Sequence, residues 1–237
     1  MVKSIPVFVI MYGNWTATSP AVPIITDLLR TAGGSPYEGV NTTYYNTSNA
    51  ISGQLTLGTV VYDSYSKGKI LSDNDVWTVV TSHIGKDLPS ANPDAVYFVI
   101  TSGDVAESSG FGSGYCGWHN AATIGTTDVK FAFVGDPSLL YASGCGAQTT
   151  GPNGNSGADA MASVILHELN EAASDPDGNA WYFDKSGNEN EDQCAWTFGT
   201  TYLTANGAKA NMKLGARDFL IQRNWLNVGT GTCALTK

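Results

Sequence analysis

The chain has 237 residues, of which 42% are hydrophobic and 11% aromatic, and this composition indicates a folded globule with a substantial core. Only 14% of the residues are charged, and the net charge of −9 argues against nucleic acid or an anionic membrane surface as a partner. No apolar stretch approaches the roughly 18 residues that span a bilayer, so we expect no membrane insertion. We predict a single domain over residues 1–237 and a monomer.

Apolar patterning in the first half of the chain predicts alternating strands and helices. The run Ile5–Tyr12 is almost continuously apolar, which is typical of a strand that is buried on both faces. The predicted elements are strand Ile5–Tyr12, helix Pro20–Ala32, strand Leu55–Tyr62, helix Asp73–Ile84, strand Ala95–Thr101 and strand Val129–Val134. This order predicts an α/β layered fold with a mostly parallel central sheet flanked by helices.

The second half of the chain is richer in glycine and serine. We predict that residues 102–127 and 135–157 form irregular connections, the first of which contains Cys116 and His119. A helix is predicted at about Asp159–Ser174, because Pro176 cannot continue it. A late strand is predicted at Phe219–Leu226. His83 lies on the apolar face of its helix, so we expect it to face the core.

Four cysteines, at positions 116, 145, 194 and 233, permit three disulfide pairings. The sequential pairing would close two loops of moderate size, each contributing about 3–4 kcal/mol. Disulfides are typical of exported proteins, so we expect a secreted protein. The first residues lack the apolar core of a signal peptide, and export would therefore use a signal already removed or another route.

The most informative stretch is His167-Glu-Leu-Asn-Glu171. On a helix, residues i and i+4 lie side by side, so His167 and Glu171 can bind one metal ion. Glu168 is then the candidate general base, as in the zincin pattern His-Glu-x-x-His, with glutamate replacing the second histidine. The alternative is a solvated helical face with an ordinary His–Glu pair, which would contribute only a few tenths of a kcal/mol.

A helical wheel places Glu168 inside the apolar stripe of this helix. A buried carboxylate is costly unless a cation meets it, and burial beside a metal would suit a general base. The alternative is a salt bridge from Glu168 to a buried lysine or arginine. We therefore predict a zincin-like active-site helix.

Two helix residues do not complete a catalytic metal site, which commonly has three protein ligands. The candidates for the third ligand, in order of preference, are Glu189, Asp192, Asp177 and His119. One neutral imidazole and two carboxylates would neutralise a divalent ion and make harder ions such as Mn²⁺ or Ca²⁺ more competitive, but zinc remains the expected metal. Tyr182 or His119 is the candidate to stabilise an oxyanion, and ordinary packing is the alternative for each.

Several short segments, in the same order, resemble the EXORDIUM or phosphate-induced protein family of plants and microbes. They are Val9–Trp15, Thr101-Ser102 with Asp104, Cys116–His119, Pro152–Gly154, His167–Glu171, Pro176, Asn179–Tyr182, Glu189-x-x-Asp192-x-Cys194, and Phe219-Leu220 with Trp225 and Cys233. The resemblance implies an extracellular or cell-wall location and the pairing Cys194–Cys233. It favours Glu189 and Asp192 over Asp177 as ligands, because the plant pattern has an apolar residue there. The plant proteins carry further cysteines near Cys116 and Cys145, and their family has no settled biochemical activity.

These observations lead to two functional hypotheses. The first is a secreted zinc metallopeptidase-like hydrolase that binds one divalent metal through His167, Glu171 and Glu189 and acts on an extracellular peptide or cell-wall substrate. The second is a non-catalytic cell-wall or glycan-binding protein with a structural metal site. Its support is the tryptophans at positions 15, 118, 181, 196 and 225 and the acidic loop at 184–192.

Overall fold

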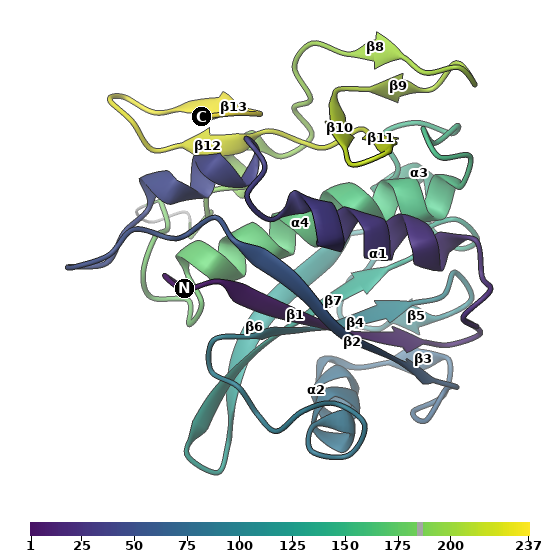
Figure 1. Ribbon diagram of the computed structural model, residues 1–237. Coiled ribbons are helices and arrows are strands. Elements are labelled where there is room, and N and C mark those ends of the chain that lie inside the picture. The colour runs from purple at the N-terminus through teal and green to yellow at the C-terminus, as the bar shows by residue number, and fades with distance from the viewer. Residues whose placement is uncertain (184–186) are drawn as a thin grey trace.

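A five-stranded sheet forms the centre of the computed structural model, which describes residues 1–183 and 187–237 (Figure 1). Its strands lie in the order β2 (Leu55–Asp63), β1 (Ile5–Tyr12), β4 (Val96–Thr101), β7 (Thr127–Gly135) and β6 (Gly117–Ile124). The first four run parallel, and β6 pairs antiparallel with β7 at the edge. The predicted α/β class with a mostly parallel central sheet is confirmed.

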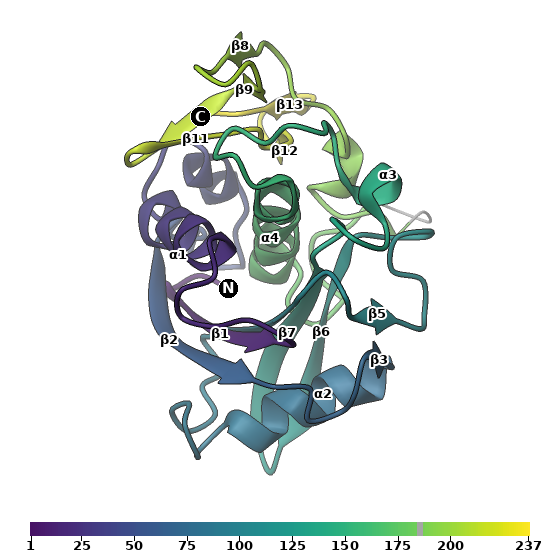
Figure 2. The ribbon, with the colours of Figure 1, turned by 90° about the vertical axis from the view of Figure 1, so that its right-hand side faces the viewer.

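Helices cover both faces of this sheet (Figure 2). Helices α1 (Ala21–Ala32) and α4 (Ser156–Ser174) lie on one face and α2 (Asp73–His83) lies on the other. In β1, Val7, Val9 and Met11 pack in the core beneath α1 and α4, whereas Phe8, Ile10 and Tyr12 pack in the core beside α2. Because side chains alternate along a strand, the apolar run of β1 fills two cores at once.

The remaining elements are short. They are η1 (Glu38–Thr43), β3 (Ile70–Leu71), β5 (Ala106–Glu107), α3 (Ala142–Cys145), η3 (Asp192–Cys194), β8 (Tyr202–Leu203), β9 (Lys209–Ala210), β10 (Met212–Leu214), β11 (Arg217–Phe219), β12 (Asn224–Leu226) and β13 (Thr232–Ala234). The segment from β8 to β13 lies over the outer side of α1 and α4 (Figure 1). None of the helices in the described part of the chain is long and apolar enough to cross a membrane.

The predictions for the two connections and for the late strand are wrong. The 135–157 connection contains the short helix α3 and the first two residues of α4. The 102–127 connection contains strand β6, because Gly125 and Thr126 form a two-residue turn between β6 and β7, with Gly125 at φ 62°. The late strand at Phe219–Leu226 is instead two strands, β11 and β12. Between them the backbone bonds elsewhere: the amide of Gln222 donates to Ser163 Oγ at 3.0 Å, and that of Arg223 donates to the Thr197 carbonyl at 2.8 Å.

Two disulfides are present, Cys116–Cys145 and Cys194–Cys233. The first joins the start of β6 to α3, and the second joins η3 to β13. His83 is 5% exposed, as expected for a residue facing the core, and its ring nitrogens lie 3.2 Å from Asp63 Oδ2 and 2.8 Å from Asp87 Oδ1.

Candidate metal centre

Helix α4 carries the His-Glu-Leu-Asn-Glu motif. It begins three residues earlier than predicted, because the Asn155 side chain accepts a hydrogen bond from the Ala158 amide at 3.0 Å and caps the helix. It ends at Ser174, before Pro176. One turn apart within it, His167 Nε2 lies 3.1 Å from Glu171 Oε1, as the i, i+4 spacing predicts.

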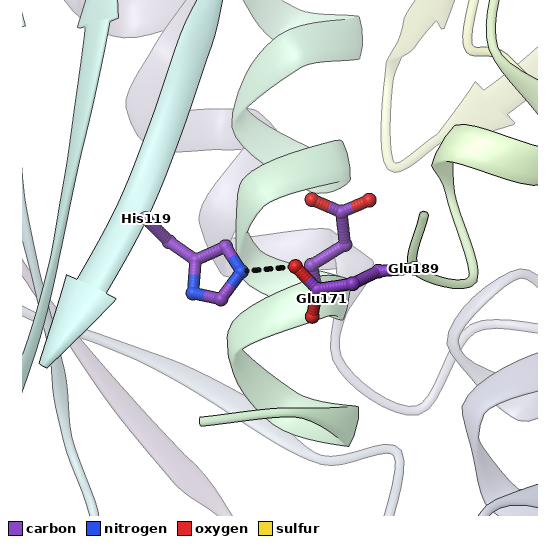
Figure 3. Close-up of side chains that lie close together, drawn as sticks. All are labelled: His119, Glu171 and Glu189. Atoms are coloured by element: carbon purple, nitrogen blue, oxygen red, sulfur yellow. Dashed lines mark hydrogen bonds and ion pairs between the residues drawn. The ribbon is translucent and has the colours of Figure 1, made fainter. Parts of the chain in front are cut away.

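Strand β6 brings a second histidine to the same helix. Alternation along β6 points Trp118 into the core beside α2, so Gly117 and His119 face α4. His119 Nε2 lies 2.9 Å from Glu189 Oε2, and Glu171 completes this group of potential ligands (Figure 3). His119 was predicted on an irregular loop, but the edge strand holds it beside the motif helix.

Asp192, the first residue of η3, forms part of a second group of potential ligands with His167 and Glu171. Its Oδ1 lies 3.5 Å from His167 Nε2, and its backbone amide donates to Glu171 Oε1 at 3.2 Å. Its Oδ2 accepts a hydrogen bond from the Glu189 amide at 3.1 Å. The segment Glu189–Asp192 therefore docks against the motif helix and places one carboxylate near each histidine.

The Glu168 carboxylate is buried without a basic partner among the described residues, which is unusual for a glutamate. Glu168 is 4% exposed. None of the described residues donates a hydrogen bond to its side chain, and no lysine or arginine among them forms an ion pair with it. The alternative of a salt bridge to a buried lysine or arginine therefore has no support in the described chain. Burial raises the pKa of Glu168 to about 8, although the neighbouring His167 opposes the shift.

The two imidazoles experience a strongly negative environment. Burial alone would lower the pKa of His119, but Glu189, Glu168 and Glu171 together raise it to about 9. The pKa of His167 is also raised well above its usual value, since Glu171 and Asp192 outweigh burial. Both imidazoles therefore bind protons in surroundings that also attract cations, and a bound metal would displace those protons.

A cavity of about 470 Å³ opens beside these residues. His167, Glu168 and Asp192 line one end of it, and the Cys116–Cys145 disulfide forms part of its wall. Trp196, which also lines the cavity, is 51% exposed and has φ 58°, a conformation that non-glycine residues seldom adopt. A cavity of this size accommodates a segment of a polymer or a small ligand.

Two residues behind His167 were missed by the sequence analysis. The Gln222 amide contacts His167 Nδ1 and donates to Glu191 Oε2 at 3.0 Å. Glu191 is fully buried, and its Oε1 accepts hydrogen bonds from Tyr37 at 2.8 Å and from Asn170 at 2.6 Å. The available signal was Gln222, the first polar residue after the apolar run Phe219–Ile221, which lay inside the predicted strand and was given no role.

Not every candidate reaches the centre. Asp177 Oδ1 instead lies 3.8 Å from Lys130 Nζ, and Asp177 belongs to neither group of potential ligands. Tyr182 is 48% exposed and is outside the residues that line the cavity. In the predicted acidic loop at 184–192, residues 184–186 lie outside the described residues.

Comparison with known proteins places the chain in a family. Residues 1–218 match the family model described as the phosphate-induced protein 1 conserved region. The chain is 28% identical over 268 residues to Protein EXORDIUM-like 3 of Arabidopsis thaliana, covering 96% of this chain and 78% of that protein. It is 28% identical over 263 residues to Protein EXORDIUM-like 5 of the same plant, covering 93% of this chain and 71% of that protein. None of the solved structures matches it. Because the matching family model spans most of the chain, this protein belongs to the phosphate-induced protein 1 family.

Proposed function

We propose that this protein is a secreted, metal-dependent hydrolase that cleaves a peptide or similar amide bond. The observation that carries the proposal is Glu168, a buried carboxylate with no hydrogen-bond donor among the described residues, which lines a cavity beside two histidine–carboxylate groups. Burying such a carboxylate is costly, and its place beside the histidines in the lining of a cavity suits a general base.

The donor set suits a divalent transition metal. Ligand atoms about 2.0–2.1 Å from a tetrahedral zinc ion lie about 3.3 Å apart. The nitrogen–oxygen distances of 2.9, 3.1 and 3.5 Å around His119 and His167 are close to that value. Imidazole and carboxylate together suit zinc best, and Mn²⁺ is the next candidate.

In this proposal the side chains divide the chemistry. His167, Glu171 and Asp192 hold the metal, with His119 and Glu189 beside them. A bound divalent ion would lower the pKa of a water molecule and polarise the scissile carbonyl. Glu168 takes the proton from the attacking water and delivers it to the leaving amine. We assign no oxyanion role to Tyr182, because the cavity does not include it.

The proposed location is outside the cell. Two disulfides that bridge 29 and 39 residues of sequence are typical of proteins in oxidising compartments. The cavity is open to segments of a chain rather than closed around one small molecule, since the half-exposed Trp196 forms part of it. An extracellular peptide or cell-wall polymer is therefore the proposed substrate class.

A non-catalytic glycan-binding protein is the second candidate, and one observation favours it. Trp196 presents half of its surface beside the cavity, where a sugar ring could stack on it. The tryptophans at positions 15, 118, 181 and 225 are instead partly buried and pack against the cores. One exposed ring is a small stacking platform, and it does not account for the buried Glu168.

The test compares wild-type protein with Glu168→Gln. Both are loaded with zinc, their metal content is measured, and they are incubated with a library of fluorogenic peptides and with wall polysaccharides. We expect equal metal content, and turnover at least 100-fold lower in Glu168→Gln, because glutamine fits the space but cannot accept the proton. Glu38→Gln, which alters another buried glutamate away from the cavity, is the matched control and should retain activity.

The alternatives give different results. Metal retention with no turnover by either protein, together with glycan binding that is lost in Trp196→Ala, would support the binding protein. Equal turnover by wild type and Glu168→Gln would exclude Glu168 as the base.

A further inference from the structure

We propose that this centre binds two divalent cations, bridged by the Glu171 carboxylate. One ion lies between His119, Glu189 and Glu171, and the other lies between His167, Asp192 and Glu171. The inference deepens the proposed function, since it concerns the same residues. It predicts the number of metal ions that bind to each chain, which can be measured without a substrate.

The potential metal-ligand atoms are spaced as two groups. In each group the three potential ligand atoms lie within 4.8 Å of one another, and within the described chain neither group contains both histidines. Two donors each about 2.1 Å from one ion can be at most about 4.2 Å apart. The two imidazoles thus belong to different groups, and Glu171, which belongs to both, has two oxygens and can contribute one to each.

The centre also carries a high density of negative charge. Glu168, Glu171, Glu189 and Asp192 gather around the two histidines, and no lysine or arginine among the described residues forms an ion pair with any of them. Four carboxylates carry four negative charges when ionised, and two divalent cations supply four positive charges. Negative charge gathered in a largely buried place is costly unless cations compensate it, and two divalent ions would compensate all four carboxylates.

One carboxylate oxygen of Glu189 has no partner among the described residues. Glu189 Oε1 is buried and accepts no hydrogen bond from a described residue, whereas its other oxygen faces His119. Figure 3 shows His119 and Glu189 meeting beside Glu171. A second ion held by Glu189 would compensate this buried carboxylate and use a histidine that a single site built on the helix motif leaves idle.

The test is metal stoichiometry in the full-length protein. Apo protein is titrated with Zn²⁺ by calorimetry, and its metal content is checked by elemental analysis after desalting. We expect two equivalents in wild type, one in His119→Ala and one in His167→Ala. His83→Gln, at the third histidine on the opposite face of the sheet, is the control and should bind two.

A second measurement uses Mn²⁺ as the probe. Two ions bridged by one carboxylate should give an exchange-coupled electron paramagnetic resonance spectrum in wild type. Each single-histidine variant should give the spectrum of an isolated ion. Near-ultraviolet circular dichroism confirms that each variant is folded.

The outcomes separate the two proposals. One equivalent in wild type, lost completely in either histidine variant, would overturn the two-ion inference and leave a single-ion hydrolase intact. No bound metal in wild type would overturn both. Two equivalents with no dependence on Glu168 for turnover would support the two-ion site and contradict the proposed function.

Discussion

Behind His167, Gln222 and Glu191 fix the orientation of the imidazole. A histidine that binds a metal through Nε2 carries its proton on Nδ1, and that proton requires an acceptor. A glutamine amide has a donor end and an acceptor end, so Gln222 can accept the Nδ1 proton only by turning its oxygen to the ring, which gives up its hydrogen bond to Glu191. Because Gln222 also contacts the buried Glu191, its position is tied to the network around Tyr37 and Asn170.

Replacing Gln222 with leucine should therefore weaken metal binding without removing a ligand. We expect about a 10- to 100-fold loss of metal affinity, the usual effect of removing a partner of a ligating histidine. Competition with a chromophoric zinc chelator measures this loss. The exposed Gln54, replaced by leucine in the same way, is the control and should leave the affinity unchanged. A Gln222→Leu affinity equal to wild type would show that the contact with His167 is incidental.

The contact between strand β6 and helix α4 determines the geometry of the centre. A Cβ at Gly117 would lie 2.7 Å from Val164 Cγ1 and 2.9 Å from both Glu168 Oε1 and the Phe133 carbonyl oxygen. Glycine at this position lets the strand and helix approach closely enough for His119 to reach the residues on α4. The distance between the two elements is thus a requirement of the site as well as of packing.

Gly117→Ala tests this requirement. We expect a loss of about 1–3 kcal/mol in the free energy of unfolding, because the methyl group overpacks a close contact that includes backbone. Turnover and metal affinity should fall further than stability alone explains, since Glu168 is displaced. Gly39→Ala, outside the cavity lining, is the control: its Cβ would lie 3.7 Å from the nearest atom, an ordinary contact. Urea unfolding and a zinc titration distinguish a local effect from a global one.

Across the whole molecule, the sheet separates two cores, and the candidate metal centre lies on the face covered by α1 and α4. On that face a second buried acid, Glu38 in η1, is 1% exposed, and its Oε1 has no hydrogen-bond partner among the described residues. Burial, reinforced by the charge of Glu191, raises the pKa of Glu38 to about 8. Its ionisation opposes folding, because the unfolded chain titrates at the ordinary value.

Stability should therefore fall as the pH rises from about 4.5 to about 8, the interval in which Glu38 is ionised only in the unfolded chain. Glu38→Gln should remove this part of the decline. We expect wild type and variant to have similar stability near pH 4.5, and the variant to be more stable by a few kcal/mol near pH 8.5. Urea unfolding across this range measures the difference.

Glu107, whose pKa is lowered and not raised, provides the control. Hydrogen bonds from Tyr115 and Ser109 outweigh burial and lower the pKa of Glu107, so its contribution to stability is present at high pH and is lost on acidification. Glu107→Gln should therefore be less stable than wild type at neutral pH. A Glu38→Gln difference that does not change with pH would contradict the raised pKa.

The sequence alone determined the elements with strong periodicity and the placement of the motif residues on one helix. Strand β1, helix α1 and helix α2 follow from apolar patterning, and helix α4 with Glu168 in its buried stripe follows from the helical period, since these signals are local. The tertiary structure decided which distant residues join the motif. Strand β6 was hidden because it follows a glycine-rich stretch and its own apolar pattern is weak, and only its pairing with β7 turns His119 towards α4. Gln222 and Glu191 were equally invisible, because a buried polar contact depends on two segments that meet only in the folded chain.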